Sequence, residues 1–116
     1  MMIMKIHDLI GENCITLDDG EIVFRLIVSE LNNNSSIELD FTGVRVYASP
    51  FFNGAVGKLL AEYSPEELNN RLTFHGLSEH GDQVLRRVTQ NARRYYSDKK
   101  FRDAVDKVAA EHSEGF

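Results

Sequence analysis

The sequence contains a single cysteine, Cys14, and only two prolines. One cysteine excludes a disulfide framework and a cysteine-based metal cluster, and it indicates a reducing, cytoplasmic setting. No apolar run reaches the roughly 18 residues of a membrane-spanning helix, so we expect no membrane segment. The opening MMIMKIHDLI is too short and too weakly basic for a signal peptide.

Basic residues are few in the first two thirds of the chain, and the charge is unevenly distributed. Residues 1–78 carry five Lys/Arg against eleven Asp/Glu, residues 79–107 carry eight against five, and the last nine residues add two acids. These balances of −6, +3 and −2 sum to the net charge of −5. A mildly basic segment on an acidic body argues against bulk nucleic-acid binding and is compatible with an acidic partner.

The length of 116 residues fits one domain, and 42% hydrophobic with 27% charged residues is ordinary for a globular protein. We expect a single domain over residues 1–112 and a frayed tail over 113–116. Apolar spacing predicts strands at 2–6, 36–42 and 71–75, and helices at 20–31, from Ser49 onward, 82–96 and 99–112. Such alternation is typical of an α/β domain with parallel strand pairs.

Three local patterns refine these elements. Asp18 or Asp19 is a candidate N-cap for the first helix. In IELDF the side chains of Ile37, Leu39 and Phe41 point to one face, and Val44 and Val46 are expected to resume it. The helix after Ser49 presents one broad apolar face and, opposite, a narrow strip where another backbone can approach. The apolar face comprises Phe51, Phe52, Ala55, Val56, Leu59 and Tyr63, and the strip Gly54, Gly57 and Ala61.

Ser49-Pro50 marks a switch from strand to helix and allows two interpretations. Serine is a favoured N-cap and proline suits the first helical turn, so the pair is a helix start signal. In the same geometry, a phosphate on Ser49 would be tolerated near a helix N-terminus and would change the surface by almost two charges. The second SP pair, in YSPEEL, predicts another helix start.

Catalytic and metal-binding patterns are absent from the sequence. No nucleophile is followed by an evident base, and NGAVGK lacks the spacing of a phosphate-binding loop. The four histidines (His7, His75, His80 and His112) have no metal-ligand spacing. We therefore expect no enzyme activity, no cofactor and no metal.

Four arginines lie seven residues apart in two pairs on the predicted 82–96 helix: Arg86 with Arg93, and Arg87 with Arg94. They form a basic face opposite the apolar stripe. This face is either simply solvated or a contact for an anion or an acidic partner.

The stretch IELDFTGVRVYASPFFNGAVGKLL resembles the core of the STAS-like family, prokaryotic domains related to the sulfate transporter and anti-sigma factor antagonist domain. The resemblance rests on the strand ending Leu39-Asp40-Phe41, on Gly43-Val44, and on a helix start in which Phe51, Asn53 and Gly57 fit. HGLSEHGDQVLRRVTQNARRYY resembles the family's C-terminal part, so the likeness covers about Met4 to Tyr96.

This resemblance implies a four- or five-stranded mixed sheet with helices mostly on one face, and a non-catalytic regulatory role. Domains of the wider superfamily bind a kinase-like ATPase, and phosphorylation at the start of the helix after the central strand breaks that complex. Ser49 is the nearest match to the phosphorylated position. Anti-sigma factor antagonists carry Asp-Ser-Ser/Thr-Gly there, whereas this chain has Tyr47-Ala48-Ser49-Pro50-Phe51, without the acidic residue.

Two functions follow as hypotheses. In the first, the chain binds a protein partner, a kinase-like ATPase or anti-sigma-like protein, through the corner Ala48, Ser49, Pro50, Phe51, Phe52 and Asn53. In the second, it is a small ligand- or nucleotide-binding module that uses the helix N-terminus after Ser49 and the Arg86/Arg93 face. The oligomeric state stays open.

Overall fold

The computed structural model describes residues 1–97 and contains two small parallel sheets. The larger has the order β1-β3-β5, and the smaller pairs β2 with β4. The bounds are β1 (Met2–Lys5), α1 (Ile6–Leu9), β2 (Asn13–Cys14), α2 (Leu17–Asn32), β3 (Ile37–Asp40), β4 (Val46–Tyr47), α3 (Ser49–Ala55), the 3-10 helix η1 (Gly57–Ala61), α4 (Pro65–Arg71), β5 (Leu72–His75) and α5 (Glu79–Ser97).

The observed sheets differ from the expected single mixed sheet in strand direction and in number. All three described strand pairs are parallel, and the five strands fall into a set of three and a set of two. The split follows from the turn at Gly43, where φ is +91°: it takes the chain out of β3 and into β4 beside β2. The expected α/β class with parallel pairs is confirmed, whereas the single mixed sheet is not found in residues 1–97. The expected helix at 99–112 and the tail lie outside the described residues.

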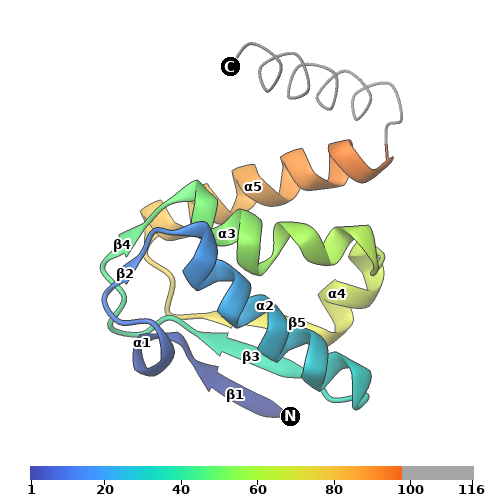
Figure 1. Cartoon of the computed structure of the whole chain (residues 1–116), viewed down its shortest axis with the longest axis horizontal. Helices are drawn as coiled ribbons and strands as arrows, with labels where there is room; N and C mark the ends of the chain where they lie inside the picture. Colours follow the sequence, from blue (N-terminus) through green and yellow to red (C-terminus); the bar gives the residue numbers. More distant parts are fainter. Residues whose placement is uncertain (98–116) are drawn as a thin grey trace.

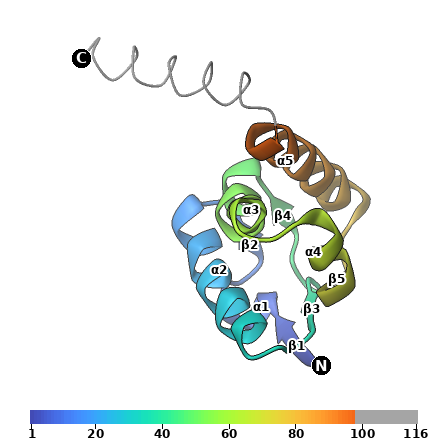
Figure 2. The ribbon, with the colours of Figure 1, turned by 90° about the vertical axis from the view of Figure 1, so that its right-hand side faces the viewer.

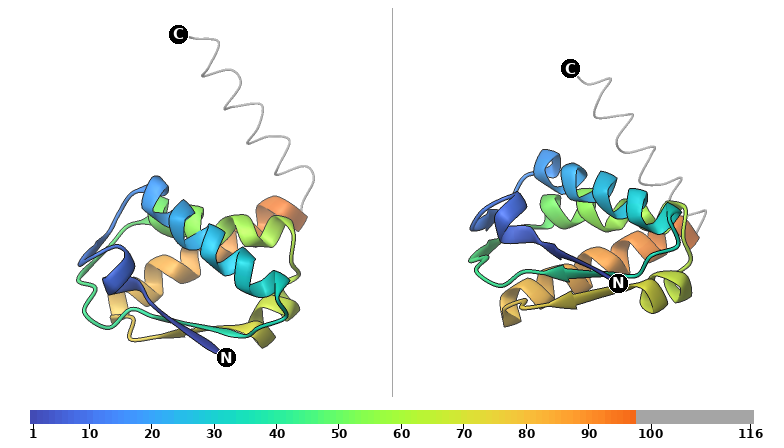
Figure 3. Two further views of the ribbon diagram at one scale, coloured as in Figure 1. Left: turned by 60° about the horizontal axis from the view of Figure 1, so that its bottom comes forward. Right: turned by 90° about the horizontal axis from the view of Figure 1, so that it is seen from below.

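Helices α2 and α3 pack together on the same side of the β1-β3-β5 sheet (Figures 1 and 2). Helix α5 lies against α3 and η1, and α4 leads directly into β5 (Figure 3). This arrangement follows from the alternation predicted in the sequence, because each parallel strand pair needs a crossover segment that returns over one face. Among residues 1–97, no helix has the length and apolar character needed to cross a bilayer.

Helix α2 begins earlier than predicted, at Leu17 rather than Gly20. Its N-cap is Thr16, whose hydroxyl oxygen accepts a hydrogen bond from the Asp19 backbone N–H at 3.1 Å. The expected caps, Asp18 and Asp19, lie instead in the first turn, where carboxylates favour the positive end of the helix dipole. The helix start predicted at the second SP pair is confirmed: Ser64 is the N-cap of α4, and its Oγ accepts a hydrogen bond from the Glu67 backbone N–H at 3.2 Å.

Glycines bring α2 and α3 into close contact. A Cβ added at Gly20 would lie 2.1 Å from the Phe51 carbonyl oxygen, and one at Gly54 would lie 2.7 Å from the Leu17 carbonyl oxygen. The prediction that a backbone approaches the small-residue strip is thus confirmed at Gly54, whereas Ala61 is exposed. Only hydrogen atoms at these two positions allow the helices to touch backbone to backbone.

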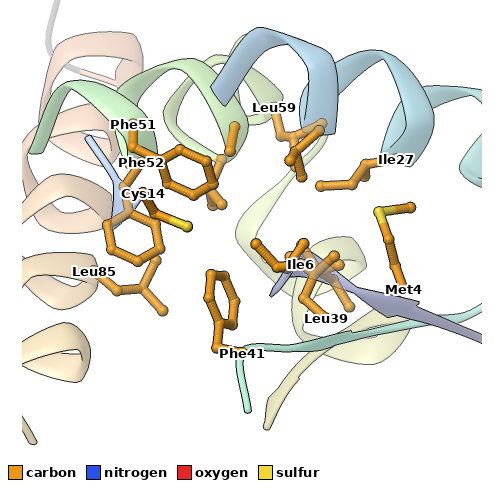
Figure 4. Close-up of a cluster of buried hydrophobic side chains, with 14 of the residues drawn as sticks. Met4, Ile6, Cys14, Ile27, Leu39, Phe41, Phe51, Phe52, Leu59 and Leu85 are labelled. Atoms are coloured by element: carbon orange, nitrogen blue, oxygen red, sulfur yellow. The ribbon is translucent and has the colours of Figure 1, made fainter. Parts of the chain in front are cut away.

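The core lies between the sheet and the helices, as Figure 4 shows. Ile37, Leu39 and Phe41 are at most 1% exposed, which confirms the face predicted for IELDF. Val46 was predicted to continue this face and is instead 44% exposed. The prediction was wrong because the alternation restarts after the Gly43 turn, so that the side chain of Tyr47 points inward in β4.

Candidate interaction surface

The corner where β4 turns into α3 is built differently from a serine-capped helix start. The N-cap is Ala48, which has no side-chain oxygen, and Ser49 is the first helical residue, followed by Pro50. Ser49 is half-buried, and none of the hydrogen bonds formed within residues 1–97 uses its hydroxyl. The interpretation of Ser49 as a helix cap was therefore wrong, and its hydroxyl stays accessible to solvent.

Two of the six expected contact residues belong to the core. Phe51 and Phe52 are 0% exposed, and their rings meet edge to face with centroids 5.4 Å apart. The Phe52 ring also stacks on Tyr47 at 6.1 Å and an interplanar angle of 4° (Figure 4 shows Phe51 and Phe52 pointing inward). A partner cannot reach these rings without unfolding the corner. The accessible part is Ala48 and Ser49, both half-buried, with Pro50 and Asn53, both exposed.

The outer face of the β2-β4 sheet carries exposed apolar side chains next to this corner. Because side chains alternate along a strand, Cys14 and Tyr47 point inward while Val46 points outward. Val46 is 44% exposed, and Ile15 and Leu17, which follow β2, are 42% and 43% exposed. The Ala48 backbone N–H donates to Cys14 O at 3.0 Å, which holds the two chain segments side by side. We call Ile15, Leu17, Val46, Ala48, Ser49, Pro50 and Asn53 the corner surface.

Helix α5 supports the corner surface from behind. Its first turn begins with a hydrogen bond from Gly81 N to Ser78 Oγ at 3.0 Å. Gly81 is buried against the Tyr47 ring, and a Cβ added there would lie 2.9 Å from two ring carbons. The Tyr47 hydroxyl donates to Val44 O at 3.3 Å, and burial raises the pKa of this phenol. These contacts fix the position of β4, which ends where the corner begins.

A groove of about 460 Å³ continues from the corner surface. It is lined by Leu17, Asn53, Gly57, Lys58, Asn91, Ala92, Tyr95 and Tyr96, which come from α2, α3, η1 and α5. Sequence reasoning missed this groove, although two of its residues, Asn53 and Gly57, belong to the helix-start pattern. The missing information was the placement of α5 across η1, which no local pattern encodes.

The four arginines of the predicted basic face all lie on α5. Arg86 Nε forms an exposed ion pair with Asp82 Oδ2 at 2.9 Å. Arg86 and Arg93 line a different groove, of about 200 Å³, together with Val56, Leu60, Pro65, Leu68, Asn69, Leu72, Phe74, Leu85 and Thr89. Arg87 and Arg94 are exposed on another flank of α5. The start of α3 does not line this groove, and the second hypothesis stays a prediction.

The groups with shifted pKa values are dispersed. Burial, with a smaller contribution from Asp19, raises the pKa of the Cys14 thiol to about 11. Hydrogen bonds from the Thr42 hydroxyl at 2.6 Å and the Thr42 backbone N–H at 2.9 Å lower the pKa of Asp40. The hydrogen bond from Lys58 Nζ at 2.9 Å lowers the pKa of Glu21. Within residues 1–97, no three His, Cys, Asp or Glu side chains gather as a metal site would need.

Residues 1–97 form a small α/β fold with parallel strand pairs, and a strand-to-helix corner joins β4 to α3. Its sequence matches the family described as STAS-like domain of unknown function (DUF4325) over residues 19–82, and the chain belongs to this family. No curated protein and no solved structure matches it. The matched region starts in the first turn of α2 and ends in the first turn of α5, so it contains β4 and the start of α3.

Proposed function

We propose that this STAS-like domain is a non-catalytic regulatory domain of the prokaryotic cytoplasm that binds a protein partner through the corner surface. The observation that carries the proposal is the exposure of Ile15, Leu17 and Val46, each above 40%, beside the half-buried Ser49. Apolar side chains gathered at the surface and rimmed by polar residues mark protein interaction sites. Buried Phe51 and Phe52 shape this surface from inside and do not contact the partner.

The resemblance to anti-sigma factor antagonists supports a kinase-like ATPase, or an anti-sigma-like protein, as the partner. In this proposal Ser49 is the regulatory position, because its hydroxyl is accessible and lies within the apolar surface that the partner covers. A phosphate placed there would bring almost two negative charges into a desolvated contact and would oppose binding. The dispersion of the ionisable groups supports a role without bond-making chemistry.

Site-specific photo-crosslinking in the native host tests the partner contact. A crosslinking residue in place of Val46 is expected to capture a kinase-like ATPase, whereas the matched position Thr73, exposed on β5, captures none. With the purified partner, Val46→Asp and Ser49→Asp are each expected to raise the dissociation constant at least about tenfold, because each places charge in the contact. Equal capture from both positions, or unchanged affinity in Val46→Asp, refutes the proposal.

A further inference from the structure

Among residues 1–97, strand β1 pairs with β3 alone, so its other side is an open edge of the larger sheet (Figure 3, left). The Met2 backbone N–H donates to Ser36 O at 2.9 Å, toward β3. Because backbone groups alternate sides along a strand, the N–H and C=O of Ile3 point away from β3, toward the open edge. Ile3 therefore offers one donor and one acceptor at this edge, and by the same alternation the Lys5 N–H also points outward.

Exposed apolar side chains flank this edge in both layers of the fold. On the sheet, Met2 is 38% and Ile3 is 53% exposed. Beside it, Leu9 of α1 and Leu26 of α2 are 45% and 37% exposed, and both line a depression of about 350 Å³ along β1. Ile22, one turn before Leu26, is 40% exposed. We call these five residues the β1 edge patch.

Strand β1 carries only some of the usual protections of an edge strand. Natural edges are shielded by short length, proline, bulges, charged side chains or a covering segment, and β1 has a length of four residues and one lysine. The β1 strand contains no proline and only one charged residue, Lys5, at its end. The unpaired backbone groups of this apolar edge are a template for pairing with another chain.

We propose that the β1 edge patch joins two copies of this chain, with β1 pairing antiparallel to β1 of a second copy about a two-fold axis at Ile3. In this register the two Ile3 residues exchange both backbone hydrogen bonds, which satisfies the outward donor and acceptor of Ile3 in each copy. The two three-stranded sheets become one continuous sheet. An isologous interface of this type is the commonest in homo-oligomers.

The area of the patch can be compared with the area that a dimer interface buries. From their exposed fractions, the five side chains present on the order of 400 Å² of apolar surface, within the range of functional patches. Met1, which is 81% exposed, and Lys5 bring the surface toward the roughly 800 Å² that each partner buries in a standard complex.

A second copy fits this surface better than a single foreign strand does. A lone strand would pair with β1 and cover Ile3, but it would leave Ile22 and Leu26 of α2 in water. A second copy brings its own α2 beside the first, so both layers are covered at once. The dimer surface shares no residue with the corner surface: both include side chains of α2, but β1 lies apart from β2 and β4 (Figure 1).

Sedimentation over a concentration series tests the dimer with the full chain. We expect the apparent mass to rise with concentration from 13.2 kDa to twice that value. Ile3→Pro removes only the outward N–H and leaves the β1-β3 ladder intact, and Leu26→Lys charges the helix layer. Each is expected to weaken the dimer at least about tenfold. The matched control Val46→Lys, at a similarly exposed apolar position, leaves the mass unchanged.

Crosslinking provides a second readout that does not depend on dimer affinity alone. Cys14 is 0% exposed, so a short bis-maleimide should react only with an introduced cysteine. Ile3→Cys, in the proposed interface, is expected to give a covalent dimer, and Val46→Cys, outside it, is not. Circular dichroism verifies that each variant is folded. A monomer at millimolar concentration, or a dimer that both Ile3→Pro and Leu26→Lys leave intact, overturns the proposal. Loss of partner binding with an intact dimer concerns the corner surface alone.

Discussion

The contact between α2 and α3 makes Gly20→Ala a severe test of the fold. The added methyl carbon would start 2.1 Å from the Phe51 carbonyl oxygen and 3.0 Å from the Ala55 nitrogen. Ordinary carbon–oxygen contacts lie near 3.3 Å, so the two backbones would have to separate by about 1 Å. Both neighbours are main-chain atoms of a packed helix, and no rotamer change can relieve the clash.

Two opposing terms set the magnitude. Overpacking in a core costs about 1–3 kcal/mol, and a backbone clash belongs at the upper end of that range. Replacing a helical glycine by alanine returns about 1 kcal/mol through helix propensity. We expect a net loss of about 2 kcal/mol in the free energy of unfolding, which corresponds to roughly 4–8 °C in Tm for each kcal/mol.

Urea denaturation followed by circular dichroism measures this difference. Gly57→Ala is the matched control, because its Cβ would meet Asn53 Oδ1 and Val88 Cγ1 at an ordinary 3.7 Å. The control is expected to stay within about 0.5 kcal/mol of the parent chain. If Gly20→Ala proves as stable as Gly57→Ala, the close backbone approach of the two helices is refuted.

Three further predictions concern the serines and the shifted pKa values. Ser64→Ala should lower the unfolding free energy by about 1 kcal/mol through loss of the α4 cap, whereas Ser49→Ala should change it by less than about 0.5 kcal/mol; equal losses in urea melts would restore Ser49 as a cap. The folded pKa of Cys14 is raised from 9.0 to about 11, so stability is full below pH 9 and falls between pH 9 and 11; Cys14→Val should flatten this decline in Tm, and an unchanged slope would contradict it. Asp40 has a lowered folded pKa, so its contribution is present above its ordinary pKa of 3.8 and is lost as pH falls through the lower folded value; Asp40→Asn should weaken the acid dependence of Tm, and identical acid melts would count against it.

Patterns that depend on neighbouring residues were predictable from the sequence. The Ser64 cap, the buried face of Ile37, Leu39 and Phe41, and the close approach at Gly54 each follow from a local rule. The family resemblance, too, rested on contiguous residues, and the match over residues 19–82 confirms it.

Features that depend on the path of the chain were not predictable. The Gly43 turn shifts the alternation, so that Tyr47 rather than Val46 faces the core. Of the two interpretations of Ser49, the helix cap was wrong, because α3 begins at Ser49 and its N-cap is Ala48. Phe51 and Phe52 were predicted to contact a partner because they lie at the strand-to-helix corner. Their side chains instead point inward and complete the core.

The close packing of Gly81 against the Tyr47 ring links α5 to the corner. The Tyr47 ring also stacks on the Phe52 ring. The start of α5, the last residue of β4 and the buried face of α3 are therefore packed in one continuous series of contacts. A truncation that removes α5 would retain every exposed residue of the corner but would remove the packing that supports Tyr47 and β4. Deletion mapping on this protein would consequently report a binding region much longer than the set of side chains that a partner touches.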